Sequence, residues 1–169
     1  MLIAYATMAQ AQLTATDAGS NVHFVIKNFG INTSGDIKGL KAVIKFDKSK
    51  PANSSFDGTV DVGTLNTDNG MRDGHLKKED YFNAEKYPQI HIKSSKIEAS
   101  SAANIFVFTG TLTIKSVTKP IRFNFTATPK ASGYYFEGNF SINRLDYGVG
   151  GNSATMSDKV KLKLTVLAK

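Results

Sequence analysis

The chain has no cysteine among its 169 residues. This absence excludes a disulfide scaffold, a thiolate zinc site, a cysteine nucleophile and a lipid-modified cysteine anchor. The sequence also lacks a G-x-S-x-G elbow, a P-loop and a dinucleotide-binding fingerprint. No run beyond the N-terminus approaches the length of a membrane-spanning helix. The length suits one domain, large enough to bury about two thirds of the surface that its unfolded chain would expose.

The N-terminus is an apolar stretch that ends in small residues. Ala9 and Ala11 have the A-x-A spacing that signal peptidase accepts. We therefore expect residues 1–11 to be a signal-peptide remnant and residues 12–169 to form one domain that is periplasmic or secreted. The positively charged region that normally begins such a peptide is missing, which leaves a disordered apolar tail as the alternative.

The formal net charge is +7, but the lysines are spread along the chain. Lys41 and Lys45, like Lys161 and Lys163, alternate with apolar residues, which is typical of the solvent face of half-buried strands. A nucleic-acid site needs a concentrated basic stripe with exposed aromatic residues between the charges. We therefore expect no nucleic-acid partner, whereas a transient contact with an anionic membrane surface stays open.

Eight segments of the chain have the composition and pattern of strands. Apolar and polar residues alternate in them with a period of two, and clusters of turn-forming residues separate them. Short connections favour antiparallel order, since parallel strands need long crossovers. The expected strands cover about 21–28, 36–47, 55–65, 89–97, 105–114, 121–128, 134–143 and 159–168, with a polar turn at 30–35.

The connection at 66–88 is too long for a hairpin loop and too polar for a strand. Asp68 is expected to cap a short helix over 69–73, and 77–80 suggest a further helical turn. Several residues of buried type argue against disorder, so we expect a short helical lid across one end of a barrel. The residues expected at this lid and mouth are Met71, Arg72, Asp73, His75, Leu76, Tyr81 and Phe82.

Three glycines, Gly58, Gly110 and Gly138, stand in the apolar register of expected strands. Such a glycine either marks a sharp bend or leaves room in the interior, and both can be true in a curved, hollow barrel. Eight strands enclose an interior that is either just filled or just wide enough for one slim ligand. The expected ligand-binding wall consists of Phe24, Ile26, Ala42, Phe46, Phe56, Gly58, Ile92, Phe106, Phe108, Gly110, Phe123, Phe125, Phe136, Gly138 and Phe140.

Six motifs carry a resemblance to a known family. They are SNVHF at 20–24, NGMRDGHL at 69–76, DYFN at 80–83, KYPQI at 86–90, GTLTIKSVTKP at 110–120 and INRLDYGVG at 142–150. In this order and spacing they resemble the YceI-like family of lipid- or polyisoprenoid-binding proteins, from about Leu13 to the C-terminus. The resemblance implies an all-β fold, an eight-stranded antiparallel lipocalin-like barrel that holds a long apolar chain and is secreted or periplasmic in bacteria. Leu40 stands where the family often has phenylalanine, which bears on the shape of the pocket.

We therefore expect a carrier, either a monomer or a homodimer, that binds a polyisoprenoid or fatty-acid-like lipid and uses no other cofactor. His23, His75 and His91 lie in different elements and lack the spacing of a zinc motif. The alternatives are an enzyme that acts on such a lipid with His75 and Asp73 as an acid–base pair, and a stress or adhesion protein whose filled barrel binds nothing.

The role of two pairs of charged residues has two interpretations. Arg72 with Asp73, and Arg144 with Asp146, stand in short segments rich in turn-forming residues. They are expected either to hold these segments by caps and ion pairs, or to contact the polar head group of a ligand at the barrel mouth.

Overall fold

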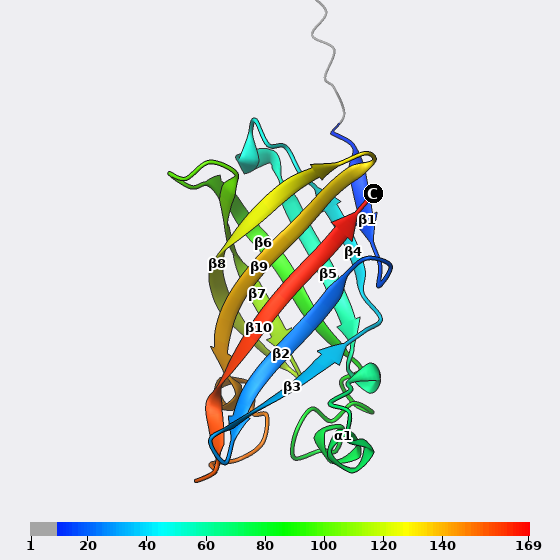
Figure 1. Cartoon of the computed structure of the whole chain (residues 1–169), viewed down its shortest axis with the longest axis vertical. Helices are drawn as coiled ribbons and strands as arrows, with labels where there is room; N and C mark the ends of the chain where they lie inside the picture. The colour runs from blue at the N-terminus through cyan, green and yellow to red at the C-terminus, as the bar shows by residue number, and fades with distance from the viewer. Residues whose placement is uncertain (1–9) are drawn as a thin grey trace, which may run out of the picture.

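The computed structural model describes residues 10–169, so the expected signal-peptide remnant lies almost entirely outside the described residues. Ten strands form one continuous antiparallel sheet, and it closes into a barrel because β1 pairs with both β4 and β10 (Figure 1). The strands are β1 (Gln12–Ala15), β2 (Asn21–Asn28), β3 (Ile31–Ile37), β4 (Lys41–Lys45), β5 (Ser55–Asp61), β6 (Gln89–Ala99), β7 (Ile105–Ile114), β8 (Val117–Lys130), β9 (Gly133–Asn143) and β10 (Met156–Ala168).

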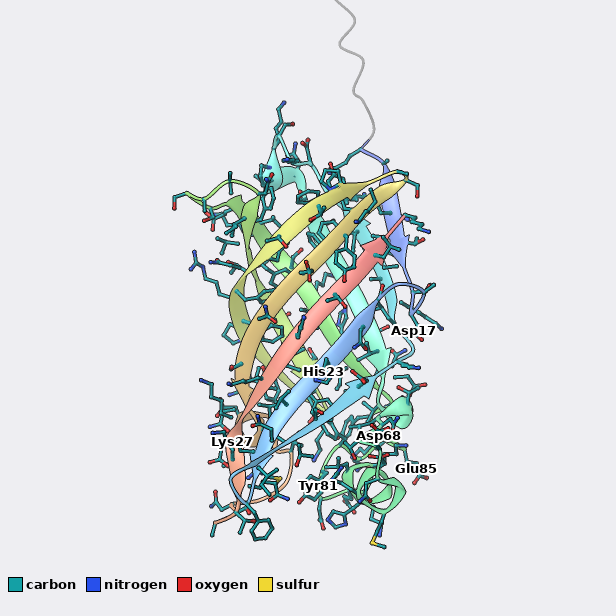
Figure 2. The ribbon with its side chains drawn as sticks, in the orientation of Figure 1. Asp17, His23, Lys27, Asp68, Tyr81 and Glu85 are labelled. Carbon is teal, nitrogen blue, oxygen red and sulfur yellow. The ribbon has the colours of Figure 1, made fainter. Side chains whose placement is uncertain are left out.

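The ten strands occupy eight positions around the barrel, because the first two positions are each filled by a broken strand. β1 and β2 both pair with β10 and together fill the first position. β4 pairs with β1, β3 pairs with β2, and these two strands fill the second position. Asp17, in the break between β1 and β2 (Figure 2), accepts hydrogen bonds from the backbone N–H groups of Gly39 and Leu40, at 3.0 and 2.9 Å. These two residues lie in the break between β3 and β4. The predicted eight-stranded antiparallel barrel is therefore confirmed, and one carboxylate ties its two interruptions together.

The predicted course of the first strands is wrong in two places. The expected strand at 36–47 is two strands, and the expected turn at 30–35 is mostly β3. The turn itself needs only Phe29 and Gly30, whose φ angles are 50° and 76°. Residues 31–37 are largely polar, and they become a strand because each pairs with a residue of β2. Pairing thus overrides a weak intrinsic preference for strand.

Short helical elements connect the strands at both ends. They are the 3₁₀ turns η1 (Pro51–Asn53), η2 (Val62–Thr64) and η3 (Arg144–Tyr147), and the helix α1 (Gly70–Leu76) at the lower end in Figure 1. Asn69 rather than Asp68 caps α1, since its side chain accepts a hydrogen bond from the Arg72 N–H. The expected helical turn at 77–80 consists of irregular turns. No helix within 10–169 has the length and apolarity that crossing a membrane requires.

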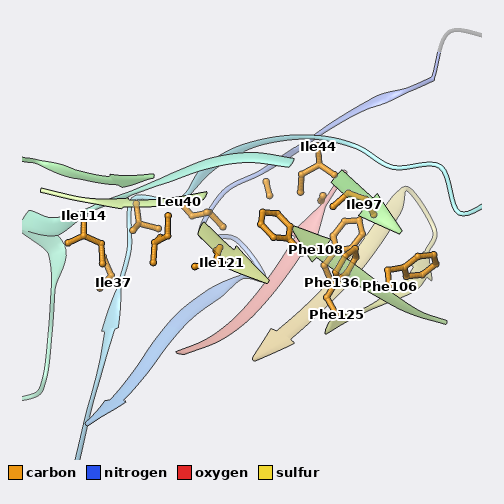
Figure 3. Close-up of a cluster of buried hydrophobic side chains, with 14 of the residues drawn as sticks. Ile37, Leu40, Ile44, Ile97, Phe106, Phe108, Ile114, Ile121, Phe125 and Phe136 are labelled. Carbon is orange, nitrogen blue, oxygen red and sulfur yellow. The ribbon is translucent and has the colours of Figure 1, made fainter. Parts of the chain in front are cut away.

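The upper half of the barrel is packed with aromatic rings. The ring of Phe46 lies 5.1 Å from that of Phe106, 4.9 Å from Tyr134 and 5.2 Å from Phe136, each edge to face. Ile97, with no exposed surface, belongs to the same buried cluster. Figure 3 shows Phe106, Phe108, Phe125 and Phe136 at one end of the buried cluster, and Ile37, Leu40, Ile114 and Ile121 further along the barrel. The upper half is therefore closed by its own side chains.

Candidate ligand-binding cavity

The lower half of the barrel contains a cavity of about 240 Å³. Inward-facing residues of the strands form its wall, and β10 alone contributes five of them, Met156, Val160, Leu162, Leu164 and Val166. The lid segment closes part of the lower end. The lining is almost entirely apolar, so the cavity is suited to a hydrocarbon chain.

Most of the predicted wall residues border this cavity. Phe46 and Phe106 do not, because they pack against each other in the closed upper half. Gly110 does not border it either. The predicted residues that do are Phe24, Ile26, Ala42, Phe56, Gly58, Ile92, Phe108, Phe123, Phe125, Phe136, Gly138 and Phe140.

The three inward glycines have three different surroundings. A side chain at Gly110 would overlap the Lys93 carbonyl oxygen, because β6 has a bulge between Ser94 and Lys96. At Gly138 the space is taken by the ring of Phe123, which would lie 2.7 Å from an added Cβ. Only Gly58 faces mainly small neighbours and the cavity. The interpretation that each glycine leaves room for a ligand is therefore wrong at Gly110, where glycine permits a close approach instead. Gly138 borders the cavity, but the Phe123 ring occupies the space beside it.

A stack of three aromatic rings stiffens one wall of the cavity. Phe123 on β8 stacks on Phe108 of β7 at 4.9 Å between ring centroids, and on Phe140 of β9 at 4.5 Å. Stacked rings of this kind stabilise neighbouring strands beyond the burial of their area. The wall between β7 and β9 is therefore a preformed surface.

The lid places three of its apolar residues on the cavity and one in solvent. Leu76, Tyr81 and Phe82 line the cavity, with Tyr81 at the lower end of the barrel (Figure 2). Met71 is 89% exposed on α1, so its predicted place over the ligand is wrong. A hydrogen bond of 2.9 Å from the Gly150 N–H to the Asp80 carbonyl oxygen fastens the lid to the segment before β10.

Arg72 and Asp73 hold the lid through a shared neighbour, Thr67. Arg72 donates from Nε to the Thr67 hydroxyl at 2.7 Å and from Nη2 to the Thr67 carbonyl at 2.8 Å. The buried Asp73 carboxylate accepts from the backbone N–H and the hydroxyl of the same threonine. Arg72 borders the cavity, whereas Asp73 and His75 do not. The ring of His75 instead meets that of Tyr81 at 5.0 Å.

Arg144 is the most buried charged residue of the mouth, with 3% of its surface exposed. Its Nη2 pairs with Asp158 Oδ1 at 2.8 Å, so the predicted pairing with Asp146 is wrong. Nε donates to the Ser157 carbonyl, and Nη1 donates to the carbonyls of Val149 and Gly151. These bonds organise 144–158, the segment that fastens the lid.

Comparison with known proteins gives the family of this barrel. The family model described as the YceI-like domain matches residues 13–168. The chain belongs to the YceI-like family. It is 34% identical over 104 residues to the UPF0312 protein plu2095 of Photorhabdus laumondii, a match that covers 61% of this chain and 53%, about half, of that relative.

Solved structures agree with the fold of this YceI-like chain. BcnA of Burkholderia cenocepacia superposes with a TM-score of 0.84 at 29% identity, over 89% of this chain and 98% of BcnA. A polyisoprenoid binding domain from Saccharophagus degradans superposes with a TM-score of 0.76 over 95% of this chain and 99% of that domain. Its identity is 14%, so this second likeness concerns the fold alone.

The other two histidines of the YceI-like barrel form hydrogen bonds with aspartates. His23 Nδ1 lies 2.7 Å from Asp36 Oδ1, and His91 Nε2 lies 2.6 Å from Asp57 Oδ1. The hydrogen bond with His91 holds the pKa of the Asp57 carboxyl below its ordinary value of 3.8. Within the described part of the chain, no three histidine, aspartate or glutamate side chains are grouped as metal ligands. Both pairs tie neighbouring strands together.

Several cavity residues of the YceI-like barrel were not singled out from the sequence. The alternation along 160–166 gives a sufficient signal for the β10 residues. Thr67 carries no such signal, because its position depends on a loop. The further lining residues include Val22, Leu40, Ile44, Leu112, Ile114, Ile142, Val149, Val160, Leu162, Leu164 and Val166.

Proposed function

We propose that this YceI-like barrel binds one long-chain apolar lipid, a polyisoprenoid or a fatty-acid-like chain, with part of its hydrocarbon in the lower half of the barrel. The observation that carries the proposal is the apolar cavity of about 240 Å³ beneath the closed aromatic half. A barrel filled by its own side chains has no such space. The fold shared with a polyisoprenoid binding domain supports the same class of ligand.

The cavity volume limits how much of the lipid is enclosed. An apolar protein cavity of about 150 Å³ holds one benzene molecule, so the cavity of about 240 Å³ corresponds to roughly ten carbon atoms on that scale. Each methylene group moved out of water contributes about 0.8 kcal/mol, or about 8 kcal/mol for ten carbons, before the cost of immobilisation. A longer chain therefore extends through the mouth.

The mouth offers a cationic group for a polar or anionic head group. The guanidinium of Arg144 is engaged by four acceptors. Arg72 borders the same cavity, and among the described residues it donates only from Nε and Nη2, both to Thr67. Its Nη1 is thus available to a ligand. We assign the head-group contact to Arg72, and the carrier role to a secreted or periplasmic protein on the basis of the A-x-A spacing at Ala9 and Ala11.

The test is lipid extraction from the purified protein followed by mass spectrometry. We expect intact lipid from the parent protein, and a loss of most of it from Leu162→Trp, because the larger side chain occupies the cavity. Lys161→Trp is the matched control, since Lys161 is the next residue of β10 and faces solvent. An empty parent protein would refute the proposal in favour of a filled barrel, and lipid products in place of intact lipid would favour the enzyme.

A further inference from the structure

Large apolar side chains are exposed to solvent on two sides of the open end of the barrel. Four large hydrophobic residues are exposed within 10–169, namely Phe29 at 73%, Ile31 at 70%, Val43 at 44% and Met71 at 89%. Phe29 and Ile31 belong to the β2–β3 hairpin and Met71 to α1, and both elements reach the lower end of the molecule (Figure 1). We call Phe29, Ile31 and Met71 the mouth rim.

The mouth rim flanks the cavity itself. Asn28 and Thr33 of the hairpin line the cavity, as do Arg72 and Leu76 of the helix. The hairpin tip and α1 therefore border one opening from two sides.

Phe29 occupies a backbone position that does not favour an aromatic residue. With Gly30 it forms a two-residue hairpin turn in which both φ angles are positive, 50° and 76°. Such turns favour asparagine followed by glycine, because a bulky side chain at positive φ is strained. The Phe29 N–H donates to the Thr155 carbonyl at 2.8 Å, which helps to hold the turn. The ring itself is mostly in solvent, so packing within the fold does not explain why a strained aromatic residue stands here. A contact between this ring and another molecule does explain it.

Ile31 lies outside the cavity, on the same face of β3 as two residues that line it. Thr33 and Ile37 of β3 line the cavity, and the period of two along a strand places Ile31 on the same face. At the rim this face has nothing to pack against. The apolar wall thus continues from the cavity to an exposed edge.

We propose that the mouth rim inserts into the surface of a lipid bilayer, so that the ligand passes between membrane and cavity along an apolar path. This inference rests on the proposed lipid-carrier function. The rim consists of a protruding hairpin tip and, on the other side of the opening, a helix of seven residues. A stable protein interface buries about 800 Å² on each partner, which a few protruding side chains do not provide, whereas a bilayer accepts single apolar side chains.

The charges of the lid favour apolar insertion over electrostatic attraction. The segment 66–88 has four basic and five acidic residues, a difference of minus one. An uncharged bilayer should therefore suffice. The basic residues are Arg72, Lys77, Lys78 and Lys86, and the acidic residues are Asp68, Asp73, Glu79, Asp80 and Glu85.

The experiment measures flotation of the protein with vesicles of pure phosphatidylcholine at low and at high salt. We expect the parent to bind equally at both, and Phe29→Asn with Ile31→Ser to bind roughly tenfold less, because two apolar side chains are removed from the membrane contact. Val43→Ser removes an exposed apolar residue of β4, outside the mouth rim, and should bind as the parent does. Phe29→Asn alone should melt no lower than the parent, since asparagine suits the turn.

A second measurement separates this inference from the carrier function. The binding of geraniol, a ten-carbon isoprenoid alcohol, is measured by calorimetry without vesicles, and it should be unchanged in the rim variants. Geraniol binding without vesicle binding would overturn the membrane inference, leave the carrier intact and direct attention to a protein acceptor. Loss of the parent's vesicle binding at high salt would also overturn the membrane inference. So would a loss of vesicle binding in Val43→Ser as large as that in the rim variant. If geraniol does not bind the parent, the carrier proposal itself fails.

Discussion

Gly138→Ala tests how tightly the cavity wall is packed. The added methyl group would lie 2.7 Å from Phe123 Cε2 and 3.1 Å from Cδ2. The Phe123 ring has little room to retreat, because it is stacked between Phe108 and Phe140. The φ angle of Gly138 is outside the left-handed region, so alanine adds bulk without strain in the backbone.

Overpacking of this kind costs about 1–3 kcal/mol of the free energy of unfolding. In a domain of this size, each kcal/mol lowers the melting temperature by about 2–4 °C, so we expect a fall of about 2–12 °C. Urea unfolding and a thermal melt measure the two quantities. Gly58→Ala is the matched control, because its methyl group would meet Ala42 Cβ at 3.2 Å and Ile92 at 3.7 Å. That variant should lose clearly less stability.

The combination with Phe123→Leu identifies the cause of the loss. If the ring fills the space beside Gly138, the double variant should be more stable than the sum of the two single losses predicts, by about 0.5–3 kcal/mol. Strictly additive losses would refute the reasoning. So would a Gly138→Ala variant as stable as the parent, since the space would then be empty and the cavity would extend to this part of β9.

The remaining predictions concern charged groups. Arg144→Met should lower the free energy of unfolding, measured in urea, by about 3–5 kcal/mol. The substitution removes four hydrogen bonds and leaves three carbonyl groups without this donor. A loss below about 1 kcal/mol would show that water replaces the guanidinium as the donor. Asp57→Asn should destabilise at neutral pH and lose this effect as the pH falls. The depressed pKa of Asp57 means that its ionised form stabilises the fold above about pH 4. This advantage is lost as the pH falls through the folded-state pKa, which lies below 3.8. An equal destabilisation at pH 2 and pH 6 would contradict this assignment.

The alternation of apolar and polar residues predicts the strands that form the wall of the barrel. β7 has the bounds that its sequence indicates, whereas β10 begins at Met156, before the expected 159, and its pairing with β2 shifts register between Met156 and Val160. The sequence does not predict β3, since residues 32–36 are polar or glycine and their strand conformation comes from pairing with β2. Local preference is informative only where burial on one face supports it.

The parts of the site that depend on loops could not be predicted in the same way. Leu76 and Met71 are both apolar residues of α1, yet one lines the cavity and the other is in solvent, because the docking of the helix decides which face is covered. Asp146 is nearer than Asp158 to Arg144 in sequence. The segment between them folds back so that Asp158 reaches the guanidinium, and no local pattern records that return.

The length of the cavity is decided by where inward-facing rings meet one another, not by how many there are. Phenylalanine faces inward in both halves of the barrel, so the sequence pattern alone predicts a slot along its whole length. In the upper half, Phe46 meets rings from β5, β7, β8 and β9 within 6.3 Å, and the rings fill the interior. In the lower half the stacked rings lie on β7, β8 and β9, and the adjacent strand β10 contributes shorter aliphatic side chains. The side chains there do not meet across the interior, so they leave space unfilled, and this difference places the cavity in the half of the barrel next to the lid.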